Sequence, residues 1–354
     1  MLTEKDKDTV HLDCSIGGGQ VLRTGIALST ILKTPVEFEN IRVNRPKPGL
    51  QAQHLTGIKA LEQMGAKTSG ALIGSQKMMY TPPGENALEH LSLDVGTAGS
   101  VTLVLQTLFL PLAFSKTPKT IEISGGTHVN WSPTTGYFSQ AFLPMAKKFG
   151  IDATLKTTRY GFYPKGGGIV EFTVNPCKEL RANSFLEKGK LKSLEGVSAQ
   201  SNLMQEIAER QKKSVLKALV SLNERPKIKV ENVDSTGQGT FVFLEANYEN
   251  SVAGFSSLGE MRKPAETIGK EAAEMFLEFH NSPAAIDAHL GDQLIPPMAL
   301  AKGKSEIRAK ITEHLLSNIK VCEHFLPIKF KVEGKEGEIG RIEVNGIGFK
   351  TEGF

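Results

Sequence analysis

The stretch VHLDCSIGGGQVLRTGIALSTIL, residues 10–32, joins an apolar strand, a turn of three consecutive glycines and an apolar helix. Strand-like PVEFENIRV follows it, and then a helical pattern, LQAQHLTGIKALEQMGAK, that ends at Gly65. Alternating apolar residues predict strands, whereas apolar residues three and four positions apart predict helices. The chain is therefore expected to begin with a βαβαββ-like unit.

The same order of elements recurs twice more along the chain. Residues 91–174 repeat it, with a closing hairpin in IDATLKTTRYGFYPKGGGIVEFTV, and residues 284–348 repeat it again from AAIDAHLGDQLIPPMALAKG onward. Recurrence of one supersecondary unit predicts units that stack on a shared core. The predicted fold class is α/β (α+β), with three repeated βαβαββ-like units forming a large domain from residues 1–181 and 281–354.

Residues 182–280 have a different character and are interpreted as a smaller inserted α/β domain. They contain two helical patterns, LMQEIAERQKKSVLKALVSL and KPAETIGKEAAEMFLEFH, and two strand-like ones, PKIKVENV and TFVFLEANYE. Strands and amphipathic helices of this length can close a small core of their own.

Composition narrows the class of protein. The 354 residues include 42 Lys and Arg against 38 Asp and Glu, and the net charge of +4 permits an anionic partner without requiring one. We find no apolar run of membrane-spanning length and no signal-peptide pattern in MLTEKDKDTV, so a cytoplasmic protein without a membrane partner is expected. Cys14, Cys177 and Cys322 are scattered, which argues against a disulfide framework or a zinc site.

The glycine turn SIGGGQVLR is a candidate anion site. Glycines let backbone N–H groups approach an anion closely, and the following helix adds the favourable charge of its N-terminus. Arg23, one turn into that helix, can bind a phosphate with its two-pronged guanidinium. The alternative is a simple tight turn with a solvated Arg23, because neither a Walker A motif nor a dinucleotide fingerprint is present.

The segment IRVNRPKPGLQAQHL concentrates positive charge where a strand is expected to end. Arg42, Arg45 and Lys47 cluster there, and the prolines at 46 and 48 stiffen the backbone between them. A solvated basic loop is the alternative, but two prolines within the cluster favour a constructed site.

Other polar side chains stand out against their surroundings. The helix after the basic segment begins with Gln53 and His54, which are suited to phosphate or ribose oxygens. Gln106 lies in an apolar helix, where a buried amide must be hydrogen-bonded, either to a ligand or to nearby backbone. RYGFYPKGGG, residues 159–168, is either an aromatic clasp for nucleotides or a glycine-rich hairpin tip.

His314 lies where a strand gives way to a helix. The alternation in SEIRAKI predicts a strand that ends near Lys310, with Thr312 as the N-cap of a helix and His314 in its first turn. The positive end of the helix dipole disfavours the imidazolium form and keeps the ring neutral and nucleophilic. The alternative is a histidine that is merely solvated or hydrogen-bonded.

Asp292 and Gln293 supply further chemistry in the same unit. The pattern AHLGDQL predicts a glycine turn just before them, where they can orient the imidazole, bind ribose or help to hold a metal. The alternative is an acidic first turn of a helix, which is a common arrangement.

Taken together, these motifs resemble those of the RNA 3'-terminal phosphate cyclase family in order and spacing. The resemblance covers nearly the whole chain and is weakest in the insert. It is carried by seven motifs: GGGQVLRT, IRVNRPKPGLQAQHLT, VGTAGSVTLVLQT, ISGGT, RYGFYPKGGG, GDQLIPPMALA and HLLSNI. The family implies a large domain of three repeated units with a smaller inserted domain, in agreement with the repeats.

The resemblance also implies a three-step reaction on RNA 3'-phosphate ends. A histidine, His314 by motif position, takes AMP from ATP; AMP then passes to the RNA 3'-phosphate, and the 2'-hydroxyl displaces it to form a 2',3'-cyclic phosphate. A divalent metal, Mg²⁺ or Mn²⁺, is expected beside ATP. By the same resemblance, nine residues fall at positions that contact ATP or the RNA end: Arg23, Arg42, Arg45, Gln53, Gln106, Pro133, His289, Asp292 and Gln293.

Two positions depart from the family pattern. A glutamate associated with metal and ATP is usual before the glycines, where this chain has Ile16, with Asp13 close by. The aromatic residue expected before DQL is replaced by His289, which can still stack on a base.

These departures leave other functions open. A catalytically degenerate, cyclase-like RNA-binding or ribosome-assembly factor is the alternative, and an enolpyruvyl transferase, whose enzymes share the repeated unit, ranks third. The sequence leaves open the RNA substrate, the preferred metal and whether the chain forms a homodimer.

Overall fold

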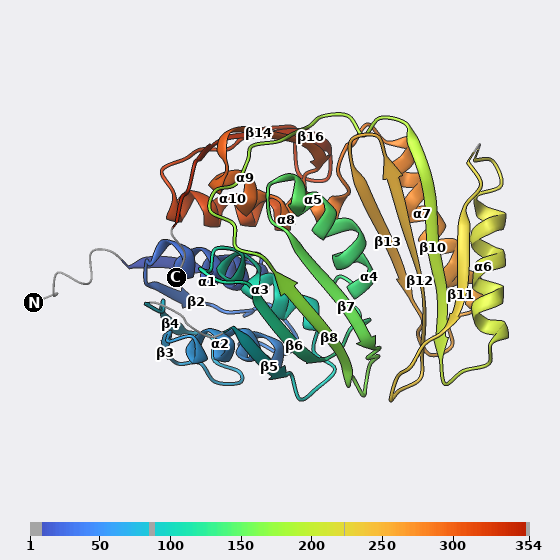
Figure 1. The fold of residues 1–354 in the computed structure, drawn as a ribbon, viewed down its shortest axis with the longest axis horizontal. Coiled ribbons are helices and arrows are strands. Elements are labelled where there is room, and N and C mark those ends of the chain that lie inside the picture. The colour runs from blue at the N-terminus through green and yellow to red at the C-terminus, as the bar shows by residue number, and fades with distance from the viewer. Residues whose placement is uncertain (1–8, 85–88, 223, 352–354) are drawn as a thin grey trace, which may run out of the picture.

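Three four-stranded sheets with the same topology form most of the molecule (Figure 1). The computed structural model describes residues 9–84, 89–222 and 224–351. In each sheet the first strand runs parallel to the second, and the other neighbours are antiparallel. The predicted α/β (α+β) class with three repeated units is confirmed.

The first two sheets follow the sequence closely. The first contains β1 (Val10–Asp13), β2 (Val36–Glu39), β4 (Met78–Thr81) and β3 (Lys67–Ser69), in that spatial order. The second contains β5 (His90–Asp94), β6 (Lys119–Gly125), β8 (Gly168–Val174) and β7 (Ala153–Arg159). Their helices are α1 (Gly19–Leu32), α2 (Ala52–Gln63), α3 (Val101–Ala113) and the run α4 (Thr135–Tyr137), η2 (Phe138–Phe142) and α5 (Leu143–Lys148).

The third unit departs from the expected order at its start. The sequence predicts its first strand at AAID, residues 284–287, but this segment forms no strand. The backbone N–H groups of Ala285 and Ile286 both donate to the carbonyl of Arg308. The first strand is instead β9 (Ser184–Phe185), which pairs parallel with β14 (Lys302–Lys310). β16 (Ile339–Ile347) and β15 (Lys331–Glu333) complete the sheet. The range 182–280 therefore includes two residues that pair within the third sheet.

Helices from all three units meet in one core. α1 packs against α3 and against α10 (Glu313–Phe325), the second helical segment of the third unit, whose first segment is α8 (Ala288–Gln293) and α9 (Ile295–Leu300). α1 is buried along nearly its whole length, and a helix enclosed on all sides needs apolar residues all round. Apolar residues accordingly occur on every side of α1, and the polar side chains among them, such as Arg23 and Thr24, are buried too.

The fourth sheet belongs to the insert, on the right of Figure 1. Its spatial order is β11 (Lys227–Asn232), β10 (Leu191–Ser201), β12 (Gly239–Tyr248) and β13 (Val252–Leu258). α6 (Glu206–Ala218) and α7 (Ala265–Asn281) pack on the sheet and form a separate core with it around Val215, Ile268 and Phe276.

The insert is joined to the second unit through side chains of its sheet. Phe241 and Phe243 of β12 are part of the main core rather than the insert core. A Cβ atom on Gly254 of β13 would lie 2.8 Å from the Tyr137 ring, so glycine permits this close approach.

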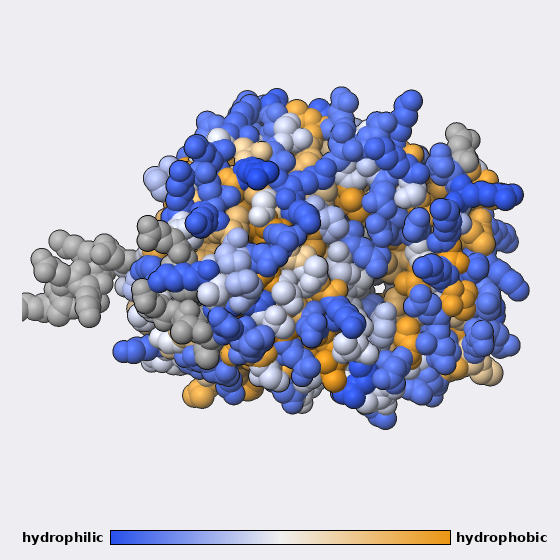
Figure 2. Space-filling view, in the orientation of Figure 1, coloured by the Kyte–Doolittle hydropathy of each residue, from blue (hydrophilic) through white to orange (hydrophobic). Residues whose placement is uncertain are grey.

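Figure 2 shows that the face viewed is mainly hydrophilic, with hydrophobic side chains in small areas that include the strands of the insert.

Two expectations from composition can be compared with the structure. Cys14, Cys177 and Cys322 are all buried and free, as expected for a chain without a disulfide framework. Within the described ranges, we find no helix with the length and apolarity needed to cross a membrane.

Candidate active site

The first turn of α10 presents His314 to solvent. β14 ends at Lys310, and the Thr312 hydroxyl accepts a hydrogen bond from the backbone N–H of Leu315 at 3.1 Å. The predicted N-cap is therefore confirmed. Leu315 and Cys322 are buried on one side of the helix, which fixes its orientation and leaves His314 exposed on another.

The surroundings of His314 favour its neutral form. Partial burial of the ring lowers its pKa below the ordinary value, and the positive charges of Arg23 and Arg45 act in the same direction. The carboxylate of Glu313 opposes this effect. A neutral imidazole has a free lone pair at neutral pH, as a nucleophile requires.

The glycine turn lies directly against the start of α10. Gly17 and Gly18 have positive φ angles of 75° and 46°, and a Cβ atom on Gly17 would lie 2.6 Å from the Ser317 hydroxyl. The backbone N–H of Gly17 donates to a Glu313 carboxylate oxygen at 3.3 Å. The side chain of Ile16 is 58% exposed beside this contact.

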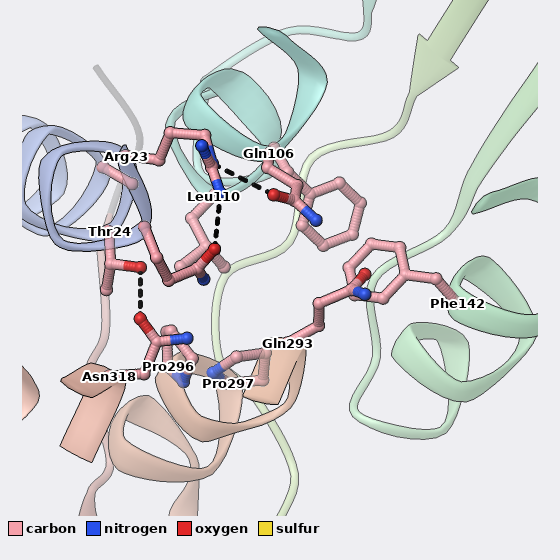
Figure 3. A pocket seen from close by; sticks show the side chains of 12 residues that line it. Arg23, Thr24, Gln106, Leu110, Phe142, Gln293, Pro296, Pro297 and Asn318 are labelled. Atoms are coloured by element: carbon pink, nitrogen blue, oxygen red, sulfur yellow. Dashed lines mark hydrogen bonds between the residues drawn. The ribbon is translucent and has the colours of Figure 1, made fainter. Parts of the chain in front are cut away.

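Arg23 forms the charged wall of a small pocket beside the turn (Figure 3). Its Nε donates to Gln106 Oε1 at 3.1 Å and its Nη2 donates to Gln20 Oε1 at 2.6 Å. Burial lowers the pKa of Arg23 to about 10, so the guanidinium is still charged at neutral pH. The partner of Gln106 is thus a side chain and not nearby backbone.

The other side of this pocket comes from the third unit. Thr24 donates to Asn318 Oδ1 at 2.7 Å, and Asn318 Nδ2 donates to the backbone carbonyl of Asp292 at 2.8 Å. Gln293 reaches into the pocket from α8, opposite Arg23 (Figure 3). These contacts connect α1, α8 and α10, and Gln106 and Phe142 of the second unit also line the pocket, so it lies where all three units meet.

α8 begins differently from the sequence prediction. Gly291 is a residue of the helix and not a turn before it, and its missing side chain lets α8 approach Ala309 and Leu315 closely. Asp287 caps the helix by accepting hydrogen bonds from the backbone N–H groups of residues 289 and 290 at 3.1 and 2.9 Å. Tyr137 donates to the same carboxylate at 2.8 Å.

Asp292 and Gln293 both have unusual environments. Burial raises the pKa of Asp292 to about 8; Asp287 adds to the effect and Arg23 opposes it. Gln293 Nε2 donates to the carbonyl of His289 at 3.0 Å, whereas its Oε1 atom is buried without a hydrogen-bond partner in the described structure. A buried acceptor without a partner is a candidate ligand contact.

The basic segment folds into a compact loop beside the glycine turn. Arg42, with φ of 53°, donates through Nη1 to the carbonyls of Lys47 and Gly49 at 2.8 and 3.0 Å. Its side chain also passes 3.6 Å from the position of a Cβ atom on Gly18. Arg45 is exposed on this loop, and its charge reaches His314. The segment is therefore an ordered loop held by its own hydrogen bonds, and its role as a binding site stays a prediction.

Gln53 and His54 connect this loop to the second unit and the glycine turn. Gln53 Oε1 accepts from the backbone N–H of Ser100, the N-cap of α3, at 2.8 Å. His54 Nδ1 accepts from the backbone N–H of Gln51 at 3.0 Å, which places the ring hydrogen on Nε2. That Nε2 lies 3.0 Å from the position of a Cβ atom on Gly19, so it faces the turn.

Pro133 and His289 approach the site from other elements. The Pro133 carbonyl accepts from the Thr102 hydroxyl at 2.7 Å, just before α4. His289 is exposed, and its ring lies edge-on to that of Tyr137 with centroids 6.2 Å apart. The structure thus places His289 beside Tyr137 and Asp287, and Pro133 between α3 and the start of α4.

The hairpin at residues 159–168 packs two of its aromatic rings inside the protein. Tyr160 and Phe162 contact His128 and Phe241, and the backbone N–H of Tyr160 donates to the carbonyl of Asp234 at 2.8 Å. The hairpin therefore attaches the insert to the second unit.

Sequence reasoning missed Tyr137, Asp287 and Glu313. A signal for Glu313 existed, because it immediately precedes His314, whereas Tyr137 and Asp287 are 150 positions apart and meet only in the folded chain.

No group of three or more His, Cys, Asp or Glu residues able to hold a metal occurs among the described residues. The described side chains therefore do not fit a metal site built from such residues alone.

Comparison with known proteins agrees with this geometry. The family model for RNA 3'-terminal phosphate cyclase matches residues 14–332. The chain belongs to this cyclase family. The family prediction made from the seven motifs is thereby confirmed, as is membership of a family of enzymes.

Relatives of this cyclase-family chain match it over nearly their full length. An RNA 3'-terminal phosphate cyclase of Pyrococcus abyssi is 42% identical over 329 residues, covering 93% of this chain and 96% of the relative. The cyclase of Pyrobaculum neutrophilum is 40% identical over 348 residues, or 96% and 99% of the two chains. That of Nostoc punctiforme is 36% identical over 317 residues, or 87% and 91%.

Proposed function

We propose that this protein converts the 3'-terminal phosphate of RNA to a 2',3'-cyclic phosphate with ATP, through AMP bound covalently to His314. The observation that carries the proposal is an exposed His314, with its pKa lowered below the ordinary value, in the first turn of α10, next to a glycine turn and the cations of Arg23 and Arg45. The proposal places the enzyme in the cytoplasm with RNA ends as its substrate.

In the first step the lone pair of a His314 ring nitrogen attacks the α-phosphorus of ATP. A nitrogen–phosphorus bond forms, the bond to the bridging oxygen breaks, and pyrophosphate leaves. The backbone N–H groups at the start of α10 and the guanidiniums of Arg23 and Arg45 suit the negative charge that builds up on the phosphoryl oxygens. Arg23 is held by Gln20 and Gln106, so its charge is positioned before ATP arrives.

In the second and third steps the RNA end takes over the adenylate. A 3'-phosphate oxygen attacks the phosphorus on His314, the nitrogen–phosphorus bond breaks, and the ring is regenerated. The adjacent 2'-hydroxyl then loses its proton as it attacks the terminal phosphorus, and AMP leaves. The exposed Arg45 and the adjacent Arg42 are the groups that we assign to the RNA 3'-phosphate.

ATP is proposed to bind with Mg²⁺ or Mn²⁺ carried mainly by its phosphate oxygens, which are ligands that Mg²⁺ commonly uses. A bound cation would neutralise part of the triphosphate charge. None of the steps above is assigned to it, since the part of the chain that the structure describes has no group of three or more His, Cys, Asp or Glu residues able to hold it.

Incubation with ATP labelled at the α-phosphate tests this proposal. With divalent metal and no RNA, we expect an acid-labile label on the protein, none on His314→Ala, and label on His324→Ala, a matched histidine in the last turn of the same helix. Label on His314→Ala equal to that of the unmodified protein would reject the assignment.

A second candidate function is a non-catalytic RNA-binding relative. The exposed Ile16 in the place of a carboxylate favours it. In the labelling experiment this function predicts RNA binding without any label on the protein. For the cyclase we expect Ile16→Glu to give an unchanged or stronger label.

A further inference from the structure

The tryptophan of the loop before α4 is almost completely exposed. Trp131 is the single tryptophan of the chain, and 98% of its surface is accessible. Its φ angle is 66°, in the left-handed region that residues other than glycine rarely adopt. Exposure of so large an apolar ring in a strained backbone conformation requires an explanation, because burial of the ring would be favourable.

A second loop, from the insert, lies next to this one. Asn130 Nδ2 donates to Glu260 Oε1 at 3.3 Å, which connects the two loops. The insert loop is tightened by a hydrogen bond from the backbone N–H of residue 263 to the carbonyl of Glu260 at 3.1 Å. Residues next to Glu260 are exposed: Met261 is 91% accessible, and Arg262, with φ of 65°, also faces solvent.

The charge of Arg262 is available to a ligand. Among the described residues it has no hydrogen-bond or ion-pair partner, whereas the neighbouring Lys263 is paired with Glu271. An aromatic ring and an unpaired guanidinium on adjacent loops match the two parts of a nucleotide, a base that stacks and a phosphate that is anionic.

The loop of Trp131 leads directly to the proposed active site. Pro133 follows two residues later, Thr134 caps α4, and Tyr137 of that helix donates to Asp287 at 2.8 Å. A ligand that covers Trp131 therefore lies at the seam between the second unit and the insert, beside the site and outside its pocket.

We propose that Trp131, with Met261 and Arg262, forms a stacking surface for an unpaired base of the RNA upstream of its 3'-phosphate. The proposal rests on the proposed function, and it assigns to these two loops the recognition of single-stranded RNA. The 3'-phosphate itself is bound elsewhere, so the surface affects RNA affinity and not the reaction of ATP with His314.

Because Trp131 is the only tryptophan, its fluorescence reports on this surface directly. Without ATP, we expect single-stranded oligoribonucleotides with a 3'-phosphate to quench the emission in a saturable manner. ATP without RNA should leave the emission nearly unchanged. Quenching by ATP alone would assign the ring to adenine and overturn the proposal, as would full RNA binding without any change in emission.

Kinetics of variants provide the second test. We expect Trp131→Ala to raise the KM for RNA about 5- to 100-fold, since stacking on one aromatic ring contributes that much to binding. Trp131→Phe should restore most of the affinity, and Arg262→Gln should weaken binding and reduce its salt dependence. Val220→Ala, an 82% exposed apolar residue in the loop after α6, is the matched control and should have no effect.

Adenylylation of His314 in the absence of RNA separates the two proposals. It should be the same in Trp131→Ala as in the unmodified protein. An equal loss of label and of RNA affinity in this variant would overturn the stacking surface. Absence of label in the unmodified protein would instead reject the proposed function, whether or not RNA quenches the tryptophan.

Discussion

The reactivity of His314 depends on charges contributed by several elements. Glu313 precedes it in α10, Arg45 belongs to the loop after β2, and Arg23 comes from α1. Glu313 raises the pKa of the ring, whereas partial burial and the two arginines lower it. Since only the neutral ring can attack phosphorus, these charges determine the pH above which adenylylation proceeds.

Charge substitutions around His314 should therefore shift the pH dependence in opposite directions. Glu313→Gln removes the charge that raises the pKa, so half-maximal adenylylation should occur at a lower pH than in the unmodified protein. Arg45→Gln removes a charge that lowers the pKa, so the midpoint should move to a higher pH. The rate of label incorporation measured from pH 5 to 8 checks both, and shifts in the same direction would contradict this explanation.

Asp292 should make stability depend on pH. Its pKa is about 8 in the folded protein and about 3.9 in an unfolded chain, so the folded state binds the extra proton between these values. The contribution of Asp292 to the free energy of unfolding is therefore fully present below about pH 4. It is lost as the pH rises from there toward 8.

We expect Asp292→Asn to remove this contribution. The free energy of unfolding of the unmodified protein should fall relative to the variant by on the order of 2–3 kcal/mol between pH 5 and 8. Denaturant titrations at both pH values measure it. An identical pH dependence in the two proteins would show that Asp292 is ionised in the folded state.

At the scale of elements, the start of α10 combines a stabilising cap with the position of His314. The Thr312 hydroxyl satisfies a backbone N–H in the first turn and holds the turn in the geometry that exposes the imidazole. Thr312→Ala should reduce the free energy of unfolding by about 1 kcal/mol. Thr312→Ser, which keeps the hydroxyl, should be close to the unmodified protein in thermal denaturation and in labelling.

Elements with local signals could be predicted from the sequence, and those set by distant partners could not. The cap at Thr312 depends on a few adjacent residues, so its pattern is visible in the chain. β9 is only two residues long, and it is a strand because β14, more than a hundred residues later, lies beside it. The sequence predicts a turn at Gly291, but this glycine lies within α8, where the helix passes close to Ala309.

In the candidate site, too, some features could be predicted from local sequence and others depend on distant partners. The motifs around Arg23 and His314 predicted a shared site, and in the structure the charge of Arg23 acts on the His314 ring. The pairing of Arg23 with Gln106 joins α1 to α3, and that of Thr24 with Asn318 joins α1 to α10. Such pairs could not be derived from one sequence, since nothing local fixes which buried amide meets which side chain.

At the scale of the whole molecule, the seam between the second unit and the insert supports the site. Gly254 of the insert approaches Tyr137, and Tyr137 holds Asp287 at the start of α8. A change at this seam can therefore alter both stability and the placement of Asp292.

Two glycines at the seam allow a matched comparison. Gly254→Ala would place a Cβ atom 2.8 Å from the Tyr137 ring and 3.1 Å from Ala141, and such overpacking should cost about 1–3 kcal/mol. Gly136→Ala would place its Cβ atom no closer than 3.4 Å to Phe243, an ordinary contact, and should have little effect. Thermal denaturation distinguishes them, and equal losses would contradict the packing argument.

The pairing of β9 with β14 has a consequence for synthesis of the protein. Ser184 leaves the ribosome 122 residues before Glu306, its partner in the third sheet. The first two sheets and the insert sheet have all their strands by residue 258, while the third sheet still lacks three of its four. The third sheet must therefore form late in the folding of the nascent chain. α10 and its histidine reach their final positions at the same late stage.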